Sequence, residues 1–292
     1  MNKNELMKNI KYKLQFISDE KYVKLYYRLK FGKKLNIDSP KTFNEKLQWL
    51  KFNDRDPMYS IAVDKYAVRK FISNNNYGNL LIPIYGVFKK FDDIDFEKLP
   101  KQFVLKCNHD SGDIAICFDK DKFDIRKAKK TICKSLGRNY YNIGREWQYK
   151  NIKPLIICEK FIGENNIPPM DYKISCFNGK PDNVMVCLDR EKGSPKYYFF
   201  DRNWELLPYN NLSKNATNDF KNLKPNNLDE MFDIAEKLSK PYYFSRIDLY
   251  NVNGKIYFGE ITLCPDSGFD SNLLEEVDLK FGKKLLLPLI DY

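Results

Sequence analysis

The sequence lacks any long apolar run. Among its 292 residues, no stretch approaches the roughly 20 apolar residues that a transmembrane helix requires. The opening segment MNKNELMKNI also lacks the apolar core of a signal peptide. We therefore expect a soluble, cytoplasmic protein without a transmembrane segment.

Histidine and paired cysteines are equally scarce. His109 is the single histidine, and the seven cysteines form no CxxC pair, which argues against a zinc site or a disulfide framework. Four of the cysteines, Cys107, Cys158, Cys176 and Cys187, lie in apolar, strand-like runs. Free cysteine in such runs packs as a small hydrophobe, so we expect these four in the core.

Several common nucleotide-binding motifs are missing. The chain has no GxxxxGK[ST] loop, no GxGxxG fingerprint and no pair of HRD and DFG motifs. These absences argue against a P-loop NTPase, a Rossmann dinucleotide-binding domain and a protein kinase. No serine or cysteine stands in a convincing arrangement with the single histidine, so covalent catalysis by a side-chain nucleophile is not expected either.

Positive charge is abundant and unevenly placed. The formal net charge is +11, and residues 1–50 alone hold eleven lysines and one arginine against five acidic residues. Such a segment attracts polyanions, which include nucleic acid, anionic lipid and acidic glycan, and charge does not choose among them. A solvated basic helix would account for the same composition.

The first hundred residues show mainly helical patterns. Leu6, Ile10, Leu14 and Ile17 recur at helical spacing, and Ser18 is placed to cap a second helix that ends near Gly32. A capping box predicts a third helix over residues 43–52. A fourth is expected to follow Pro57 and to carry Asp64 and Lys65 before a loop at residues 74–78.

From residue 103 onward, short strand patterns dominate. They are FVLKC, IAICF, LIICEKFI, DYKISCF, VMVCL, KYYFF, YFSRIDLY and KIYFGEIT, with helical stretches at residues 125–136 and 228–240. This order predicts an α+β protein with antiparallel sheets. The length and the 43% hydrophobic content suit one large domain or two interlocked ones.

The last two strands carry the strongest chemical signal. Alternation places Arg246 and Asp248 on one face of the first strand, and Glu260 and Thr262 on one face of the second, together with Ile256 and Phe258. Two carboxylates and a hydroxyl on adjacent strands suit Mg²⁺ bridged to phosphates, and the arginine can hold a phosphoryl group. A salt-bridged, solvent-facing hairpin is the alternative interpretation.

A lysine before a glycine-containing loop is a second candidate. Lys106 ends a strand pattern, and the loop after it contains His109, Ser111 and Gly112. An ammonium group and loop N–H groups together can hold phosphates. An exposed strand lysine before an ordinary turn would have the same sequence.

Two further segments could bind a nucleoside. An apolar strand ends in the hinge Glu159, Lys160, Phe161 and Ile162, which can offer backbone groups to an adenine edge. In DYKISCF, alternation puts Asp171 and Lys173 on one face. There the carboxylate can accept from ribose hydroxyls and the ammonium can reach a phosphate.

The order of these pieces resembles an ATP-grasp enzyme. Within that superfamily the sequence looks like the TupA-like (teichuronopeptide biosynthesis) branch, from about Thr42 to Phe269. The similarity rests on FNEKLQWLK, DKYAVRKFI, KCNHDSG, EWQYKNIKP, CEKFI, DYKISCFNGKP and FSRIDLYNVNGKIYFGEITLCPDSGF. It implies an ATP-grasp fold, with a helical region at 1–100 and two ATP-grasp subdomains at 101–157 and 158–292.

The resemblance also implies site roles. It gives ATP phosphates to Lys65 and Lys106, the adenine pocket to residues 159–162, the ribose to Asp171 and the phosphoryl group to Arg246. Asp248 and Glu260 match Mg²⁺ ligands. Thr262 stands where many ATP-grasp ligases have a third ligand, asparagine.

What the resemblance implies for function is an ATP- and Mg²⁺-dependent ligase of bacterial polysaccharide biosynthesis. It would convert a carboxylate into an acyl phosphate and pass it to an amine or amino acid. The expected acceptor is an anionic glycan or glycosyl precursor, with peripheral contact to a membrane-linked glycan and no nucleic acid. Two alternatives stay open: a glycosyltransferase using a DxD triplet at residues 54–56, 93–95 or 119–121, and a non-enzymatic polyanion-binding protein.

Overall fold

The computed structural model describes residues 14–189, 193–217 and 219–288. Most of the first predicted helix, including Leu6 and Ile10, lies outside these ranges, and residues 14–17 form a turn. Helix α2 (Asp19–Phe31) follows and ends where Gly32 adopts a left-handed φ of 68°. Ser18 precedes the helix as predicted but makes no capping hydrogen bond through its side chain.

Among the next three helices is a break in which Asp64 and Lys65 lie. Helix α3 (Phe43–Asn53) begins with the predicted capping box between Thr42 and Glu45. The single helix expected after Pro57 is wrong, because the structure has two: α4 (Met58–Val63) and α5 (Val68–Asn74). Asp64 and Lys65 lie in the break between them.

The break has a local physical cause. The Asp64 carboxylate accepts hydrogen bonds from the backbone N–H groups of Tyr66 and Ala67 at 2.8 and 3.1 Å, which competes with continuation of the helix. The Lys65 N–H donates to the carbonyl of Asn108 at 3.0 Å instead of to a helical carbonyl. Lys65 is therefore tied to the loop that follows a strand of the first sheet.

The first sheet has four strands in the order β1 (Ile84–Phe88), β4 (Ile156–Lys160), β2 (Phe103–Cys107) and β3 (Ile114–Cys117). Helix α6 (Ile125–Leu136) packs on it, and Ala128 and Ile132 join its buried cluster. Strand β1 interrupts the region expected to be helical up to residue 100, and β4 crosses residue 157. The division into three regions stays a prediction.

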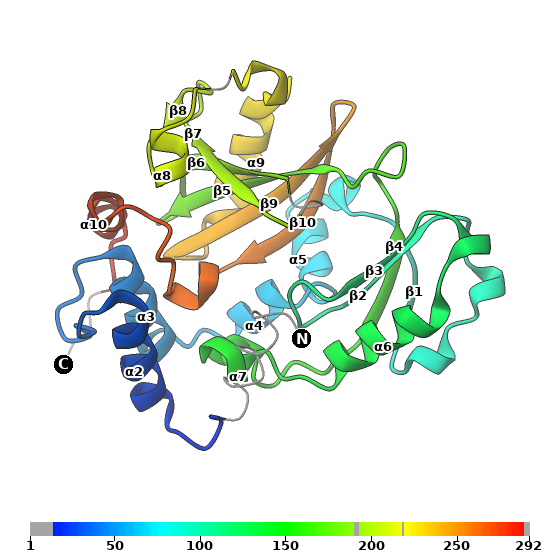
Figure 1. Cartoon of the computed structure of the whole chain (residues 1–292), viewed down its shortest axis with the longest axis horizontal. Helices are drawn as coiled ribbons and strands as arrows, with labels where there is room; N and C mark the ends of the chain where they lie inside the picture. Colours follow the sequence, from blue (N-terminus) through cyan, green and yellow to red (C-terminus); the bar gives the residue numbers. More distant parts are fainter. Residues whose placement is uncertain (1–13, 190–192, 218, 289–292) are drawn as a thin grey trace.

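The second sheet has six strands, in the order β10 (Lys255–Thr262), β9 (Phe244–Val252), β5 (Met170–Phe177), β6 (Lys180–Leu188), β7 (Lys196–Phe200) and β8 (Leu206–Leu207). All pairings between the named strands in the described residues are antiparallel, which confirms the predicted α+β class. Helix α9 (Leu228–Ser239) covers one face of this sheet (Figure 1).

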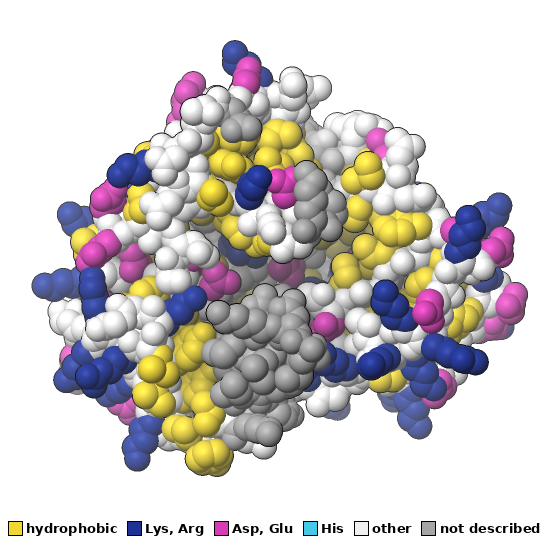
Figure 2. Space-filling model, in the orientation of Figure 1, with side chains coloured by type: hydrophobic (Ala, Val, Ile, Leu, Met, Phe, Trp, Pro, Cys, Tyr) yellow, Lys and Arg dark blue, Asp and Glu magenta, His cyan; other side chains and the backbone are white. Residues whose placement is uncertain are grey.

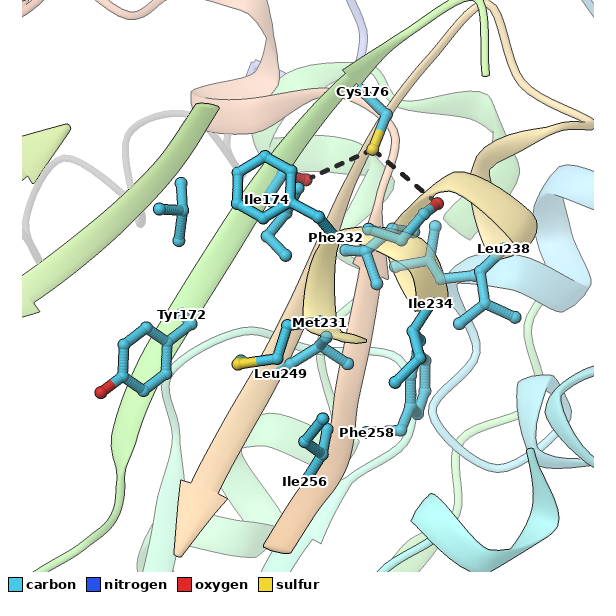
Figure 3. Close-up of a cluster of buried hydrophobic side chains, with 14 of the residues drawn as sticks. Tyr172, Ile174, Cys176, Met231, Phe232, Ile234, Leu238, Leu249, Ile256 and Phe258 are labelled. Atoms are coloured by element: carbon cyan, nitrogen blue, oxygen red, sulfur yellow. Dashed lines mark hydrogen bonds between the residues drawn. The ribbon is translucent and has the colours of Figure 1, made fainter. Parts of the chain in front are cut away.

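A large apolar core lies between this sheet and α9. Figure 3 shows Ile174 and Cys176 from β5 and Leu249 from β9 packed against Met231 and Phe232 of the helix. Cys107, Cys158 and Cys176 are buried in the two sheets' cores, as predicted. Cys187 is only partly buried and faces a cavity on the other side of the sheet.

The remaining helices close the structure at the end of the second sheet. Helix α10 (Glu275–Lys284) packs against α3, and their interface contains Phe43 and Phe281 in an edge-to-face contact, with ring centroids 5.7 Å apart. Two short helices, α7 (Tyr141–Gly144) and α8 (Asn211–Lys214), lie in the connections. Within the described ranges, no helix is both long and apolar enough to cross a bilayer.

Candidate functional site

A cavity of about 1400 Å³ is lined by residues from both sheets. Val104 and Lys106 of β2 contribute from the first sheet, and Asp171, Lys173 and Arg246 contribute from the face of the second sheet opposite α9. Pockets that bind one drug-sized ligand typically measure about 300–1,000 Å³, so this cavity has room for more than one small substrate.

A β-bulge determines which side chains reach this cavity. Strand β10 pairs Phe258 with Leu249 but Glu260 with Asp248, so the register shifts at Gly259. Glu260 consequently turns to the cavity, whereas Phe258 is buried in the core under α9. The prediction that Ile256 and Phe258 share a face with Glu260 is wrong, because simple alternation does not foresee a bulge.

Asp248 is the centre of a buried ionic cluster. Its side chain accepts two hydrogen bonds from Arg246, Nε to Oδ1 at 2.7 Å and Nη2 to Oδ2 at 2.8 Å, and a third from the ammonium of Lys173. Lys173 also pairs with Asp171, Nζ to Oδ2 at 2.6 Å. Arg246 and Asp248 share a strand face as predicted, and so do Asp171 and Lys173, and the structure joins the two pairs in one cluster.

Glu260 is held by a lysine from outside the hairpin. Its Oε2 lies 3.0 Å from Nζ of Lys65, and its Oε1 lies 3.9 Å from Nη2 of Arg246. Lys65 also donates to the backbone carbonyl of Asp110 at 2.9 Å. The break between α4 and α5 thus brings Lys65 to the same cluster as Asp248 and Glu260.

The cluster perturbs the acidities of its members. Burial acts to raise the pKa of Glu260, but Lys65, Lys173 and Arg246 outweigh it, so the pKa lies well below its usual value. Burial is also the largest influence on Asp248 and raises its pKa, while Arg246 and Lys173 act against that rise. Burial alone would lower the pKa of Lys173, yet the carboxylates of Asp248 and Asp171 raise it. Lys173 is therefore a permanent cation at neutral pH.

Thr262 occupies a different position from that expected of a metal ligand. Its Oγ1 accepts a hydrogen bond from Nη2 of Arg246 at 3.2 Å, and it is not among the residues that line the cavity. Thr262 therefore orients Arg246. This position does not support the predicted role of Thr262 as a metal ligand.

The other lysine pair lies on the first sheet. Lys106 Nζ lies 2.5 Å from Oε1 of Glu159 on the neighbouring strand β4. Both side chains are largely buried and both line the cavity. Lys160, Phe161 and Ile162 line it as well, so the whole predicted hinge reaches the cavity.

Sequence reasoning missed the apolar walls around the hinge. Ile82, Val104, Ile116 and Met170 line the cavity together with Phe161, and aliphatic walls of this kind suit a flat aromatic ring. Only Val104 was recognisable, because it shares a strand face with Lys106. The others come from segments whose pairing the sequence does not specify.

The loop after β2 divides into two parts. Ser111 and Gly112 line the cavity, and Gly112 has a φ of 94°, which favours glycine. His109 does not line it. The histidine is 2% exposed, and its ring nitrogens lie 3.2 Å from Oδ1 of Asn108 and 2.9 Å from the carbonyl of Arg138. Its predicted phosphate contact is therefore wrong, and it fixes the loop instead.

A strained loop forms the far wall of the cavity. Asp266, Ser267 and Gly268 have φ values of 45°, 55° and 70°, and both Pro265 and Asp266 line the cavity. Non-glycine residues keep such angles only where the surroundings impose them, and such sites cluster around functional centres. Nothing in the sequence pattern singled out this loop.

Buried polar groups from distant segments hold the loop in place. Lys51 of α3 donates to the carbonyl of Ser267 at 2.9 Å, and Gln48 donates to the same oxygen at 3.1 Å. The Ser267 hydroxyl donates to Oε1 of Glu146 at 2.7 Å. A Cβ on Gly144 would lie 2.0 Å from that hydroxyl, so this packing requires glycine.

The donor groups in the cavity fit Mg²⁺ held jointly with phosphates. Among the described residues, no group of three or more His, Cys, Asp or Glu side chains forms a metal site on its own. Mg²⁺ usually takes only one or two protein carboxylates and completes its shell with phosphate oxygens and water. Asp248 and Glu260, paired across two strands, supply such hard oxygens beside cations that suit phosphates.

A known protein family matches most of the chain. The family model described as "TupA-like ATPgrasp" matches residues 45–286. No curated protein matches the sequence significantly.

Several solved ligases are among the structures to which the chain is similar. D-alanine–D-alanine ligase from Bacillus anthracis, solved with ATP, is 19% identical, with a TM-score of 0.44, over 78% of this chain and 64% of its own. The enzyme of the same name from Helicobacter pylori is 15% identical, with a TM-score of 0.46, over 84% of this chain and 69% of its own. L-amino acid ligase from Bacillus licheniformis is 13% identical, with a TM-score of 0.44, over 87% of this chain and 57% of its own. This chain thus spans about two thirds or less of the length of these proteins.

Proposed function

The chain belongs to the TupA-like ATP-grasp family, and we propose that it is an ATP-dependent ligase that activates a carboxylate and joins it to an amine. One observation carries this proposal. Asp248 and Glu260 lie paired in a two-sheet cavity, surrounded by Lys65, Lys173 and Arg246. Such a cluster has the hard oxygens and the fixed cations that a triphosphate and its Mg²⁺ require.

Residues of both sheets would bind the nucleotide. The hinge residues Glu159 to Ile162 and the aliphatic walls would hold the adenine, and Asp171 would accept from the ribose. Lys65, Lys106 and the Ser111–Gly112 turn would bind the phosphates. Asp248 and Glu260 would hold Mg²⁺, which when bound neutralises phosphate charge and polarises the phosphorus–oxygen bond.

The protein's own part in the reaction is positioning and charge stabilisation. A substrate carboxylate oxygen bonds to the γ-phosphorus of ATP while the bond from that phosphorus to the bridging oxygen breaks, which releases ADP. Arg246 and Lys173 lie where they can stabilise the charge that builds up on the transferred group. An amine nitrogen then attacks the acyl carbon, inorganic phosphate leaves, and the nitrogen gives up a proton to form the amide.

Hydroxylamine trapping tests this reaction. A strong nucleophile in place of the natural amine converts an acyl phosphate into a hydroxamate, so ADP and hydroxamate should form in equal amounts. The trial carboxylates are uronate-containing glycans, free amino acids and short peptides. Hydroxamate from none of them, together with no ATP binding, would contradict the proposal.

For the carboxylate we propose an anionic glycan or glycosyl precursor in polysaccharide biosynthesis. The family described above and the basic balance of residues 1–50 support this choice, since a basic segment raises the local concentration of an acidic polymer. A cytoplasmic location would give the enzyme its ATP. Hydroxamate from amino acids but not from uronates would refute the glycan while leaving the ligase chemistry intact.

The glycosyltransferase alternative gains no support from the site. None of the aspartates in its three DxD triplets lines the cavity. Asp54 instead accepts a hydrogen bond from the Tyr59 hydroxyl at 2.5 Å, and Asp119 caps a short 3-10 turn. Consumption of a nucleotide sugar without ATP would nevertheless replace the ligase assignment. The expectation that no nucleic acid binds stays a prediction.

A further inference from the structure

Helix α2 has one face in the core and one face in solvent. Tyr22, Val23 and Tyr27 are buried in a cluster that includes Phe269. The outward face carries Leu25, which is 48% exposed, and Leu29, which is 74% exposed. These two leucines stand four residues apart and therefore neighbour each other on the helix surface.

A third exposed apolar side chain stands in the turn before the helix. Phe16, in the turn before α2, is 81% exposed, although Leu14 and Ile17 on either side of it pack against the buried cluster. Figure 2 shows hydrophobic surface at the lower left, where Figure 1 places α2. Exposed apolar groups gathered in this way mark an interaction surface more often than scattered ones do.

Basic side chains border the same face. At 100° per residue, Lys21 and Arg28 lie within about 60° of Leu25 around the helix axis, and both are exposed. The helix carries four basic and two acidic residues in all, and one of the acids, Glu20, pairs with Lys24 at 2.5 Å. The outward face of α2 is therefore apolar along its centre and cationic along one edge.

The inward side of α2 contacts the segment that leads to the far wall of the cavity. The Tyr26 ring meets the Phe269 ring edge to face, with centroids 4.7 Å apart. Asp270, the next residue, lines the cavity, as do Asn272 and Leu273. Helix α2 therefore packs against the chain segment that forms this wall, while its outward face stays in solvent.

We propose that the outward face of α2, made by Lys21, Leu25, Arg28 and Leu29, docks the protein onto an anionic lipid bilayer together with Phe16 from the preceding turn. A bilayer offers both hydrocarbon for the apolar side chains and negative headgroups for the cations. A polysaccharide offers little hydrocarbon. A second copy of the chain would place another net-basic helix against this one, without the negative charge that the cations require. This docking does not depend on the ligase reaction.

Vesicle co-sedimentation of the full chain tests the proposal. The protein should sediment with vesicles of phosphatidylcholine mixed with phosphatidylglycerol, and much less with phosphatidylcholine alone. Leu25→Ser/Leu29→Ser should weaken this binding about tenfold or more, since it removes most of the apolar contact. Lys21→Glu/Arg28→Glu should weaken it about tenfold or more through the headgroup charge, and added salt should act in the same direction.

A second basic helix supplies the matched control. Helix α6 exposes Lys127 and Lys130 far from α2 in the fold, and Lys127→Glu/Lys130→Glu changes the net charge as much as the α2 charge variant does. We expect the α6 variant to keep vesicle binding within about twofold of wild type. Circular dichroism and thermal unfolding establish that each variant is folded.

Three outcomes would overturn the proposal. The first is no binding to anionic vesicles. The second is an equal loss of vesicle binding in the α2 and α6 charge variants, with no loss in Leu25→Ser/Leu29→Ser. That result would indicate attraction by charge alone, and the protein would then also bind polygalacturonate, an anionic polymer without hydrocarbon. The third is a dimer in solution that Leu25→Ser/Leu29→Ser dissociates, seen by light scattering, which assigns the face to a second copy.

Discussion

Glu260 lies directly opposite Asp248 across the pairing of β9 and β10. Two carboxylates in this relation repel each other unless cations lie between or beside them. Lys65 and Arg246 approach Glu260, while Arg246 and Lys173 approach Asp248. These cations stabilise the carboxylate pair, and the position of Glu260 depends on the bulge at Gly259.

The first prediction concerns this bulge. A Cβ on Gly259 would lie 2.9 Å from the carbonyl oxygen of Asp248, so Gly259→Ala should shift the strand at the site. We expect a loss of about 1–3 kcal/mol in the free energy of unfolding, together with weaker MgATP binding. Gly137→Ala is the control, because its Cβ would lie at an ordinary 3.6 Å from its nearest neighbour. Equal behaviour of the two variants in urea unfolding and calorimetry would contradict the assignment.

The second prediction separates stability from binding at Lys106. Lys106→Met leaves Glu159 buried without this cation, which should cost about 3 kcal/mol of unfolding free energy. Lys106→Met/Glu159→Gln removes both charges and should recover most of that loss. Neither variant should recover wild-type ATP affinity if Lys106 binds phosphate. Wild-type affinity in the double variant, measured by calorimetry, would make Lys106 a purely structural residue.

The third prediction concerns pH. Burial raises the pKa of Glu146 from 4.5 to about 7, although Lys51 and the hydroxyl of Ser267 oppose the rise. The folded protein therefore binds a proton more tightly than the unfolded chain does. Stability from this group is full below about pH 4.5 and is lost as the pH rises to about 7, by at most about 3 kcal/mol.

Glu146→Gln isolates this effect, because the amide keeps the shape and does not titrate. The difference in unfolding free energy between wild type and variant should change across this pH range. The contributions of other titrating groups are the same in both proteins and cancel in this difference. Asp270, whose burial raises its pKa to about 6, is one such group. Parallel stability curves for the two proteins would show that Glu146 does not titrate as inferred.

Much of the architecture follows from local patterns. The predicted helix at residues 125–136 coincides with α6, and every predicted strand is present, because alternation and capping are local properties of the chain. Asp171 and Lys173 meet as the period of two requires. Arg246 and Asp248 meet for the same reason.

The errors have causes that hydrophobic periodicity does not detect. The bulge at Gly259 changes the sheet face on which the following side chains of β10 lie. The Asp64 side chain ends a helix that the hydrophobic pattern would continue. His109 resembled a ligand because it is a lone polar ring in a loop, yet its partners come from residues 108 and 138. The strained loop at 264–268 depends on α3 and Glu146, which sequence spacing does not connect to it.

The most direct test of the account is the effect of Mg²⁺ on ATP binding to Glu260→Gln, measured by titration calorimetry beside wild type. Lys65, Lys173 and Arg246 hold the pKa of Glu260 low despite its burial, so the group is charged at neutral pH and available to Mg²⁺. Glu230→Gln, on the exposed surface of α9, removes the same charge elsewhere. We predict that Mg²⁺ tightens ATP binding about tenfold or more, or about 1.4 kcal/mol, in wild type and Glu230→Gln, and that this gain is lost in Glu260→Gln. No ATP binding to wild type, or the same gain in all three proteins, would contradict the account.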